Sequence, residues 1–174
     1  MFRRRQQQDQ GSAPPNVYKM RQSLISIGDD YWIENGAGER AFRVDGKAFR
    51  IRKTLVIEDP AGNEVATLKE KLVSVRDVMT IERGGQVLAT VKKALFTPLR
   101  ERFEVEGAGV KYDVQGNITD HQYEFERDGQ QVASVSKRWF AIRDTYGVEI
   151  GPNEDVALVL AATVALDQMT HDVG

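Results

Sequence analysis

VALVLAATVAL, residues Val156 to Leu166, has no charged side chain, although 29% of the whole chain is charged. Its apolar side chains point in every direction around a helical period of 3.6 residues, so a helix made from it has to be hidden on all sides. A membrane span needs about 20 apolar residues, whereas this shorter run is flanked by Asp155 and Asp167. The segment therefore predicts a helix buried in the protein's own interior.

The residues around this run predict where the helix begins and ends. Pro152 and Asn153 are typical of a helix start, and Glu154 and Asp155 would then lie in the first turn, where the helix dipole favours acids. We expect a helix at about residues 153–170. Small residues make it slim enough to pass through a tube of side chains; they are Ala157, Ala161, Ala162 and Ala165.

The rest of the chain predicts short antiparallel strands. Runs rich in Val, Ile, Phe and Thr alternate with turn residues, as where Phe42 and Val44 precede Asp45-Gly46 and Phe49 and Ile51 follow. Many such hairpins in succession predict a sandwich or a barrel. Further turn signals are Asn35-Gly36, Asp59 to Asn63, Gly84-Gly85, Gly107, Gly109, Gly116-Asn117, Asp128-Gly129 and Gly151-Pro152.

An internal repeat sharpens this prediction. When Gly62, Gly85 and Gly129 are aligned, the segments that follow, which begin NEVATLKEKL, QVLATVKKAL and QQVASVSKRW, match in their apolar positions. The spacings fit a hairpin unit of about 22 residues, with a divergent copy after Gly107. Together with the apolar helix, the repeat predicts a mainly β protein, a closed antiparallel barrel threaded by its own C-terminal helix. The matching sets are Val65, Leu88 and Val132; Ala66, Ala89 and Ala133; Thr67, Thr90 and Ser134; and Leu68, Val91 and Val135.

These residues also resemble a known family. The pattern of a turn glycine, an apolar pair, a basic pair and a bulky pair, as in VATLKEKLVS and VASVSKRWFA, is similar to the LURP-one-related family. The segment from YDVQGNITD to the helix EDVALVLAATVALDQ resembles its C-terminal half, and the resemblance covers about Val17 to Asp172. It implies the fold of the Tubby C-terminal domain and of phospholipid scramblases, about twelve strands around a buried helix. It supplies no catalytic residues, because the family has none established.

Composition limits the organisation and the partners of the chain. Residues 1–16 predict a disordered tail with three arginines, and residues 17–174 a single domain. A formal charge of -2 and a pI near 5.8 argue against nucleic-acid binding. The absence of cysteine fits a reducing cytoplasm. We expect a cytoplasmic protein, either free or peripheral to a membrane, with no transmembrane segment.

No pattern of catalytic residues emerges from the sequence. The two histidines, His121 and His171, lack a nearby histidine or carboxylate at metal-binding spacing. We expect His121 to decorate a strand and His171 to end the helix, where a cation is favoured. The acids Asp29-Asp30 and Asp144 are interpreted as solvated strand ends and turn caps. The sequence predicts no enzyme, no metal and no cofactor.

Basic residues recur at matching points of the repeat. A pair or near pair follows each turn glycine by about seven residues, and the three sets predict a patch for an anionic ligand if the hairpins lie side by side. The alternative is an ordinary solvated face whose lysines pair with Glu70, Asp77 or Glu101. The neighbouring Trp139 and Phe140 are expected in the core, and the alternative is that they insert into lipid beside Lys137 and Arg138. The candidate patch consists of Lys69, Lys71, Lys92, Lys93, Lys137 and Arg138, with Arg76, Arg100, Arg102 and Arg143 further along.

These observations predict a non-catalytic binding or scaffold module that docks anionic phospholipid headgroups or a protein partner. One alternative is a lipid-handling protein of the scramblase kind, which would need calcium ligands, and no EF-hand-like run is present. Another is a protein–protein interaction domain with no role in lipid binding. The oligomeric state stays open.

Overall fold

The computed structural model describes residues 16–21, 30–45, 54–71, 78–94, 101–140 and 145–171. These residues form twelve strands, one short 3-10 helix and one α-helix. The elements are β1 (Val17–Arg21), β2 (Tyr31–Glu34), β3 (Arg40–Asp45), β4 (Thr54–Glu58), β5 (Glu64–Glu70), β6 (Val78–Arg83), β7 (Gln86–Lys93), β8 (Glu101–Gly107), β9 (Val110–Asn117), β10 (Gln122–Arg127), β11 (Gln130–Ser136), η1 (Lys137–Trp139), β12 (Thr145–Ile150) and α2 (Val156–His171).

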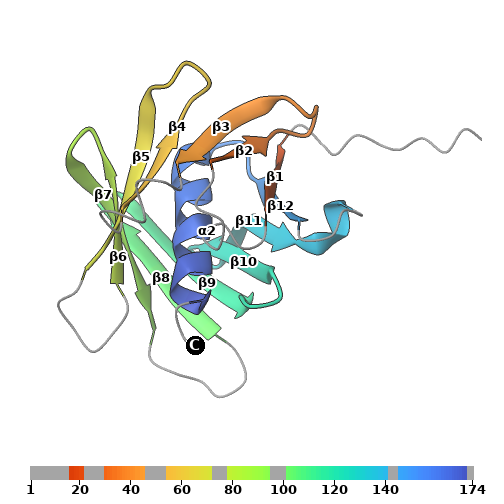
Figure 1. Cartoon of the computed structure of the whole chain (residues 1–174). Helices are drawn as coiled ribbons and strands as arrows, with labels where there is room; N and C mark the ends of the chain where they lie inside the picture. Colours follow the sequence, from red (N-terminus) through yellow and green to blue (C-terminus); the bar gives the residue numbers. More distant parts are fainter. Residues whose placement is uncertain are drawn as a thin grey trace, which may run out of the picture.

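The strands form one closed antiparallel barrel. Each strand pairs with its neighbours in the sequence, and β1 pairs with β12, where Val17 lies opposite Glu149, so the sheet has no free edge. The helix α2 runs through the ring of strands (Figure 1). The predicted barrel of about twelve strands around a C-terminal helix is confirmed.

The alternating strand directions give the barrel two distinct ends. At one end, which we name the turn end, short turns connect each even strand to the next odd strand, from β2–β3 to β10–β11. At the other, the link end, each odd strand passes to the next even strand. Because Arg83 at the end of β6 binds Asp155, whereas His121 between β9 and β10 lies beside Asp167, α2 begins at the turn end and finishes at the link end.

The sequence repeat corresponds to a repeated β-bulge. In the β4–β5, β6–β7 and β10–β11 pairs, the register shifts after Ile57, Ile81 and Phe125, which leaves one extra residue on the partner strand. Bulges increase strand twist and bend, which helps a sheet to close. A fourth shift follows Ile33 in the β2–β3 pair. The extra residues in the three repeats are Val65, Leu88 and Val132, all half-buried against the core.

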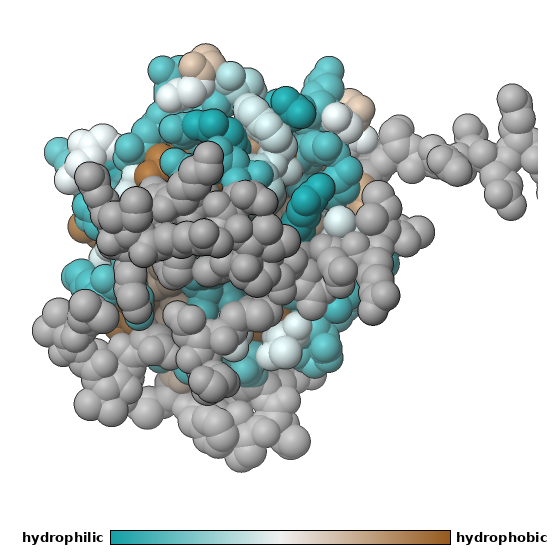
Figure 2. Space-filling model, in the orientation of Figure 1, coloured by the Kyte–Doolittle hydropathy of each residue, from teal (hydrophilic) through white to brown (hydrophobic). Residues whose placement is uncertain are grey.

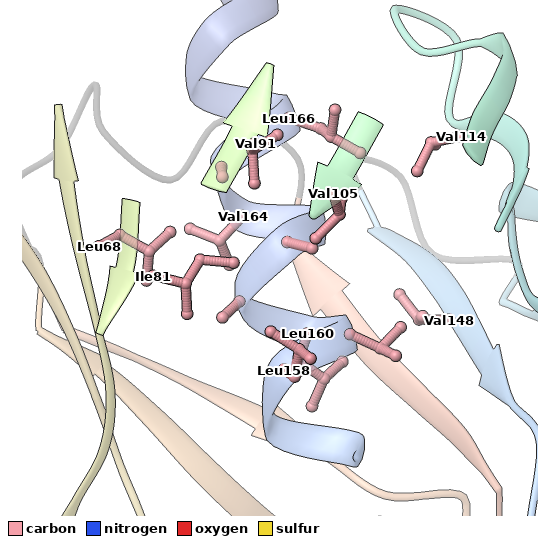
Figure 3. Packing of buried hydrophobic residues seen from close by; sticks show 14 of the residues in the cluster. Leu68, Ile81, Val91, Val105, Val114, Val148, Leu158, Leu160, Val164 and Leu166 are labelled. Carbon is pink, nitrogen blue, oxygen red and sulfur yellow. The ribbon is translucent and has the colours of Figure 1, made fainter. Parts of the chain in front are cut away.

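The central helix is buried on every side. All residues from Leu158 to Met169 are buried, as the apolar run predicted. Strand residues from around the barrel point toward the helix, with Leu68 and Ile81 on one side and Val148 on another (Figure 3). Alanines at the matching repeat positions face inward next to the bulges and leave room for the helix; these are Ala66, Ala89 and Ala133.

The helix begins later than predicted. It starts at Val156 instead of about residue 153, so Glu154 and Asp155 precede the first turn. Asp155 instead caps the helix, because its Oδ1 accepts a hydrogen bond of 3.1 Å from the backbone N–H of Leu158. The carboxylate oxygens also receive two bonds from the Arg83 guanidinium, at 2.8 and 3.0 Å.

A second ion pair fixes the chain just before the helix. Arg127 donates two hydrogen bonds to Glu154, at 2.6 and 3.1 Å, and the Tyr112 hydroxyl donates to Glu154 at 2.5 Å. Burial, and then the hydrogen bond to Glu154, raise the pKa of Tyr112 well above its usual value. Together with Arg83 and Asp155, these contacts hold the helix N-terminus to β6, β9 and β10.

One predicted turn is wrong, and several predicted segments lie outside the described residues. The tight turn expected at Asp45-Gly46 is wrong, because Val44 pairs with Ile57 and Asp45 with Val56, so a longer link joins β3 to β4. Phe49 and Ile51 lie outside the described residues. So do nearly all of the predicted N-terminal tail and the residues after His171.

A charge in the middle of the helix tests the fold. Leu160→Asp should prevent folding, because Leu160 is fully buried among apolar side chains and a charge there is costly. Leu160→Ala should lower the free energy of unfolding by about 2–5 kcal/mol, measured by urea denaturation. The control is Val87→Asp at a residue that is 55% exposed, which should change stability by less than about 0.5 kcal/mol. A cooperatively folded Leu160→Asp protein would refute the threaded barrel.

The cap gives a pH-dependent prediction. Asp155→Ala should lower the free energy of unfolding by about 1–2 kcal/mol near pH 7, because it removes the cap. The hydrogen bond from Arg83 holds the pKa of Asp155 below its usual value of 3.8. The stability from this carboxylate is therefore present above pH 4 and is lost as the pH falls below its depressed pKa. Urea titrations of the wild type and the variant should thus converge at acidic pH, and a constant difference would contradict this account.

Candidate functional site

Strand direction brings all six predicted basic residues to the same end of the barrel. They lie at the last residues of β5, β7 and β11 or just after, and odd-numbered strands all finish at the link end. Around the circumference, however, the structure divides them into two groups, because β8, β9 and β10 separate β7 from β11. The first group, the lysine group, consists of Lys69, Lys71, Lys92 and Lys93. The second, the η1 group, consists of Lys137 and Arg138.

Two lysines of the lysine group share one row across three strands. The backbone N–H of Lys71 donates to the Val78 carbonyl at 2.9 Å, and Val78 lies opposite Lys92 in the β6–β7 pair. Residues directly opposite each other point to the same face of a sheet. Lys71 and Lys92 are both exposed and have no ion pair in the described part of the chain. Their two ammonium groups therefore face solvent on the same outer surface.

The other two lysines of this group each contact a neighbouring side chain. Lys69 donates to Glu82 on β6 at 2.8 Å, rather than to Glu70, Asp77 or Glu101 as the solvated-face alternative proposed. The Nζ of Lys93 lies 5.9 Å from the ring centroid of Phe103, and Lys93 pairs with Phe103 in the sheet. Since Phe103 is fully buried, Lys93 lies over the edge of the core instead of on the outer wall.

The η1 group lies on a short 3-10 turn after β11. The Ser136 hydroxyl accepts from the backbone N–H of Arg138 and caps this turn. Lys137 and Arg138 are exposed, and within the described residues neither has an acidic partner. The Arg138 guanidinium carbon lies 4.6 Å from the centroid of the Trp139 ring, within reach of a cation–π interaction.

The prediction that Trp139 and Phe140 lie in the core is wrong. Both are half-buried on the outside of the barrel. A Cβ at Gly147 would lie 2.7 Å from Cδ1 of Trp139, so the indole packs against β12 only because residue 147 is glycine. The Nζ of Lys19 lies 6.0 Å from the Phe140 ring centroid. Because β11 ends at Ser136 and η1 follows, neither ring continues the alternation of the strand.

The remaining arginines add little to the candidate surface. Arg102 donates to Asp113 on β9 at 2.9 Å. Arg76, Arg100 and Arg143 lie outside the described residues, as do Asp29, Asp77 and Asp144. On the face drawn in Figure 2, the coloured residues are mostly hydrophilic, with apolar residues in small scattered areas. The coloured residues of this view form no broad apolar surface.

The structure corrects the role predicted for His121. This residue does not decorate a strand; it is fully buried in the turn between β9 and β10, and its Nε2 lies 3.0 Å from Oδ1 of Asp167 on α2. The hydroxyl of Tyr146 on β12 donates to the other carboxylate oxygen, and the His121 and Tyr146 rings stack with centroids 4.1 Å apart. The three residues form a buried polar cluster at the link end of the helix.

Local backbone geometry delivers His121 to the interior. Its φ is +53°, in the left-handed region that a non-glycine residue rarely adopts, and its N–H donates to the Ile118 carbonyl at 3.1 Å. Gly116, with φ +138°, lies so close to the next strand that a Cβ there would be 2.5 Å from the Gln122 carbonyl oxygen. The turn is thus shaped so that the imidazole enters the barrel beside α2.

The carboxylate of Asp167 acts on three tyrosines. Burial, together with this negative charge, raises the pKa of Tyr31, Tyr123 and Tyr146 well above the usual value. These phenols therefore stay neutral at physiological pH. The cluster contains a His–carboxylate pair, yet every member is buried, so a substrate in solution cannot reach it in this closed state.

The described residues contain no group of three or more His, Asp or Glu side chains that could hold a metal ion. Within the same residues, no helix has the length and apolar content that a membrane crossing requires. Of the six predicted basic residues, Lys71, Lys92, Lys137 and Arg138 are exposed and have no ion pair within the described residues.

Similar proteins align with nearly the full length of the chain. A protein from Bacillus subtilis, the uncharacterised YxjI, is 27% identical over 155 residues, which cover 88% of this chain and 93% of its own. LURP-one-related 15 of Arabidopsis thaliana is 26% identical over 178 aligned positions, covering 91% and 82% respectively. A crystal structure of an Arabidopsis thaliana protein superposes with a TM-score of 0.65 at 19% identity, covering 91% of this chain and 94% of that one.

The family assignment rests on the whole barrel. The profile that describes LURP-one-related proteins matches residues 16–167, from the residue before β1 to Asp167 on the central helix. The match therefore includes all twelve strands and the buried carboxylate. The chain belongs to the LURP-one-related family.

Proposed function

We propose that this protein is a non-catalytic binding module whose link end docks on anionic phospholipid headgroups. The observation that carries the proposal is the shared row of Lys71 and Lys92, two exposed ammonium groups on adjoining strands without ion pairs in the described part of the chain. Lys137 and Arg138 extend positive charge along the same end of the barrel. An end-on approach to a flat surface would bring both groups toward it.

The expected strength follows from simple electrostatics. Each basic residue near an anionic membrane contributes about 1 kcal/mol, and the attraction fades within a Debye length of about 8 Å at physiological salt. Four exposed basic residues therefore support weak, salt-sensitive and reversible docking. The protein's overall charge of -2 means that this attraction has to be local.

The non-catalytic part of the proposal is supported by where the chemically useful groups lie. The His121–Asp167 pair is closed inside the barrel, and some exposed charged side chains are paired across strands, as in Lys69–Glu82 and Arg102–Asp113.

Vesicle co-sedimentation of the full chain tests the docking proposal. Binding is expected to phosphatidylcholine vesicles that contain phosphatidylserine or phosphoinositides, and not to phosphatidylcholine alone, and it should weaken as salt increases. The double variant Lys71→Glu/Lys92→Glu should lose at least about 2 kcal/mol, which is about thirty-fold in affinity. Lys137→Glu/Arg138→Glu should weaken binding as well, because both pairs lie at the link end.

The control is a charge reversal at the turn end. Arg40→Glu/Lys111→Glu changes the net charge by the same amount at two exposed residues that flank the β2–β3 and β8–β9 turns. It should leave vesicle binding unchanged. Equal losses in the control and in Lys71→Glu/Lys92→Glu would show an effect of net charge alone and overturn docking through the link end. Absence of binding to every anionic vesicle would overturn the lipid proposal itself.

A further inference from the structure

The chain has two tryptophans, and each is half-buried beside an arginine. The guanidinium carbon of Arg138 lies 4.6 Å from the centroid of the Trp139 ring, and that of Arg40 lies 4.8 Å from the centroid of the Trp32 ring. Arg40 flanks the β2–β3 turn at the turn end, whereas Arg138 belongs to the η1 group at the link end. The two pairs are thus alike in local geometry and differ in where they lie on the barrel.

Trp139 lies against a position of the outer wall that has no side chain. Gly147 of β12 lies opposite Lys19 of β1, and residues directly opposite each other point to the same face of a sheet. A Cβ at residue 147 would lie 2.7 Å from Cδ1 of Trp139 and 3.0 Å from its Cβ, so this side chain rests directly on the β12 backbone. The next ring, Phe140, has the Nζ of Lys19 at 6.0 Å from its centroid, and Lys19 also pairs with Glu34. Two consecutive aromatic residues therefore lie on the outside of the barrel, each with a cation next to its ring.

The η1 turn combines two kinds of surface chemistry. Lys137 and Arg138 are exposed and suit phosphate oxygens, which a guanidinium binds with paired hydrogen bonds. Tryptophan is enriched at the level of lipid headgroups, because its ring is amphipathic. Since Trp139 is held against β12, its ring can reach the headgroup region of a membrane but not the centre of the bilayer.

We propose that η1 together with Phe140 is an interfacial anchor. On an anionic membrane, Lys137 and Arg138 contact the phosphates, while the rings of Trp139 and Phe140 lie at the level of the headgroups. This role rests on the proposed function, lipid docking, and identifies the part of the link end that enters the membrane interface. The lysine group adds electrostatic attraction at the same end of the barrel.

A free anion is the other occupant that these cations could bind. A soluble phosphate pairs with Lys137 and Arg138 and leaves both rings in place. A membrane surface presents phosphates together with the boundary of the acyl chains, so it engages aromatic rings as well. The pairing of aromatic and basic residues in η1 therefore favours a lipid surface.

The two tryptophans provide matched fluorescent reporters. In Trp32→Phe the remaining tryptophan is Trp139, and in Trp139→Phe it is Trp32. Each full-length variant is mixed with phosphatidylcholine vesicles that contain phosphatidylserine, with or without bromine, a quencher of indole fluorescence, on the upper part of the acyl chains. We expect the emission of Trp139 to shift to shorter wavelength and to be quenched by the brominated lipid. The emission of Trp32 should not change.

Co-sedimentation of the same samples separates the anchor from docking itself. Binding without quenching of Trp139, or with equal quenching of Trp32, would refute the anchor and leave lipid docking intact. Absence of binding would overturn lipid docking and the anchor together. An equal emission shift with soluble glycerophosphoserine alone would reveal a site for a free anion, and it would also overturn the anchor.

Removing the rings measures their contribution to affinity. Trp139→Ala/Phe140→Ala should weaken binding to the anionic vesicles several-fold, whereas Trp32→Ala should leave it unchanged. The salt dependence of binding should stay the same in the double variant, because Lys137 and Arg138 remain. The urea midpoint of each variant checks that the barrel is folded. Unchanged affinity in a folded double variant would contradict the anchor.

Discussion

The burial of a helix that has no polar face is the constraint on which the rest of the structure depends. A helix that is apolar on one side can lie on a sheet, but α2 is buried all around from Leu158 to Met169 and needs a complete ring of apolar partners. The closed barrel supplies that ring, and pairing of β1 with β12 removes the edges that an open sheet would expose. The regular bulges and inward alanines then fit the sheet to the helix.

The fold was predictable because it depends on patterns that repeat. The apolar run required a surrounding wall, and the aligned glycines revealed hairpins of nearly constant length. The structure adds the reason for the repeat: Val65, Leu88 and Val132 are bulge residues, and the alanine after each faces the helix. The helix start was misplaced because Glu154 and Asp155 each suit a first turn, whereas their actual partners, Arg127 and Arg83, are distant in sequence.

For the candidate site, the sequence predicted only that the basic residues lie at the same end of the barrel. Matching repeat positions had to reach the same end of an antiparallel barrel, and the basic residues do so, but their separation into two groups depends on how many strands lie between them. The His121–Asp167 contact joins residues far apart in the chain, so no local spacing could reveal it. Trp139 was misassigned because the 3-10 turn interrupts the alternation that the repeat had established.

The order of elements along the chain has a consequence for biosynthesis. A ribosome makes all twelve strands before it makes α2, so the inner face of the sheet, including Leu68, Ile81 and Val105, has no helix to pack against until the end. Closure of the ring also waits for β12, because Val17 pairs with Glu149. The apolar side chains of the strands therefore stay without their final partners until β12 and α2 have been made, and exposed apolar surface of this kind favours aggregation.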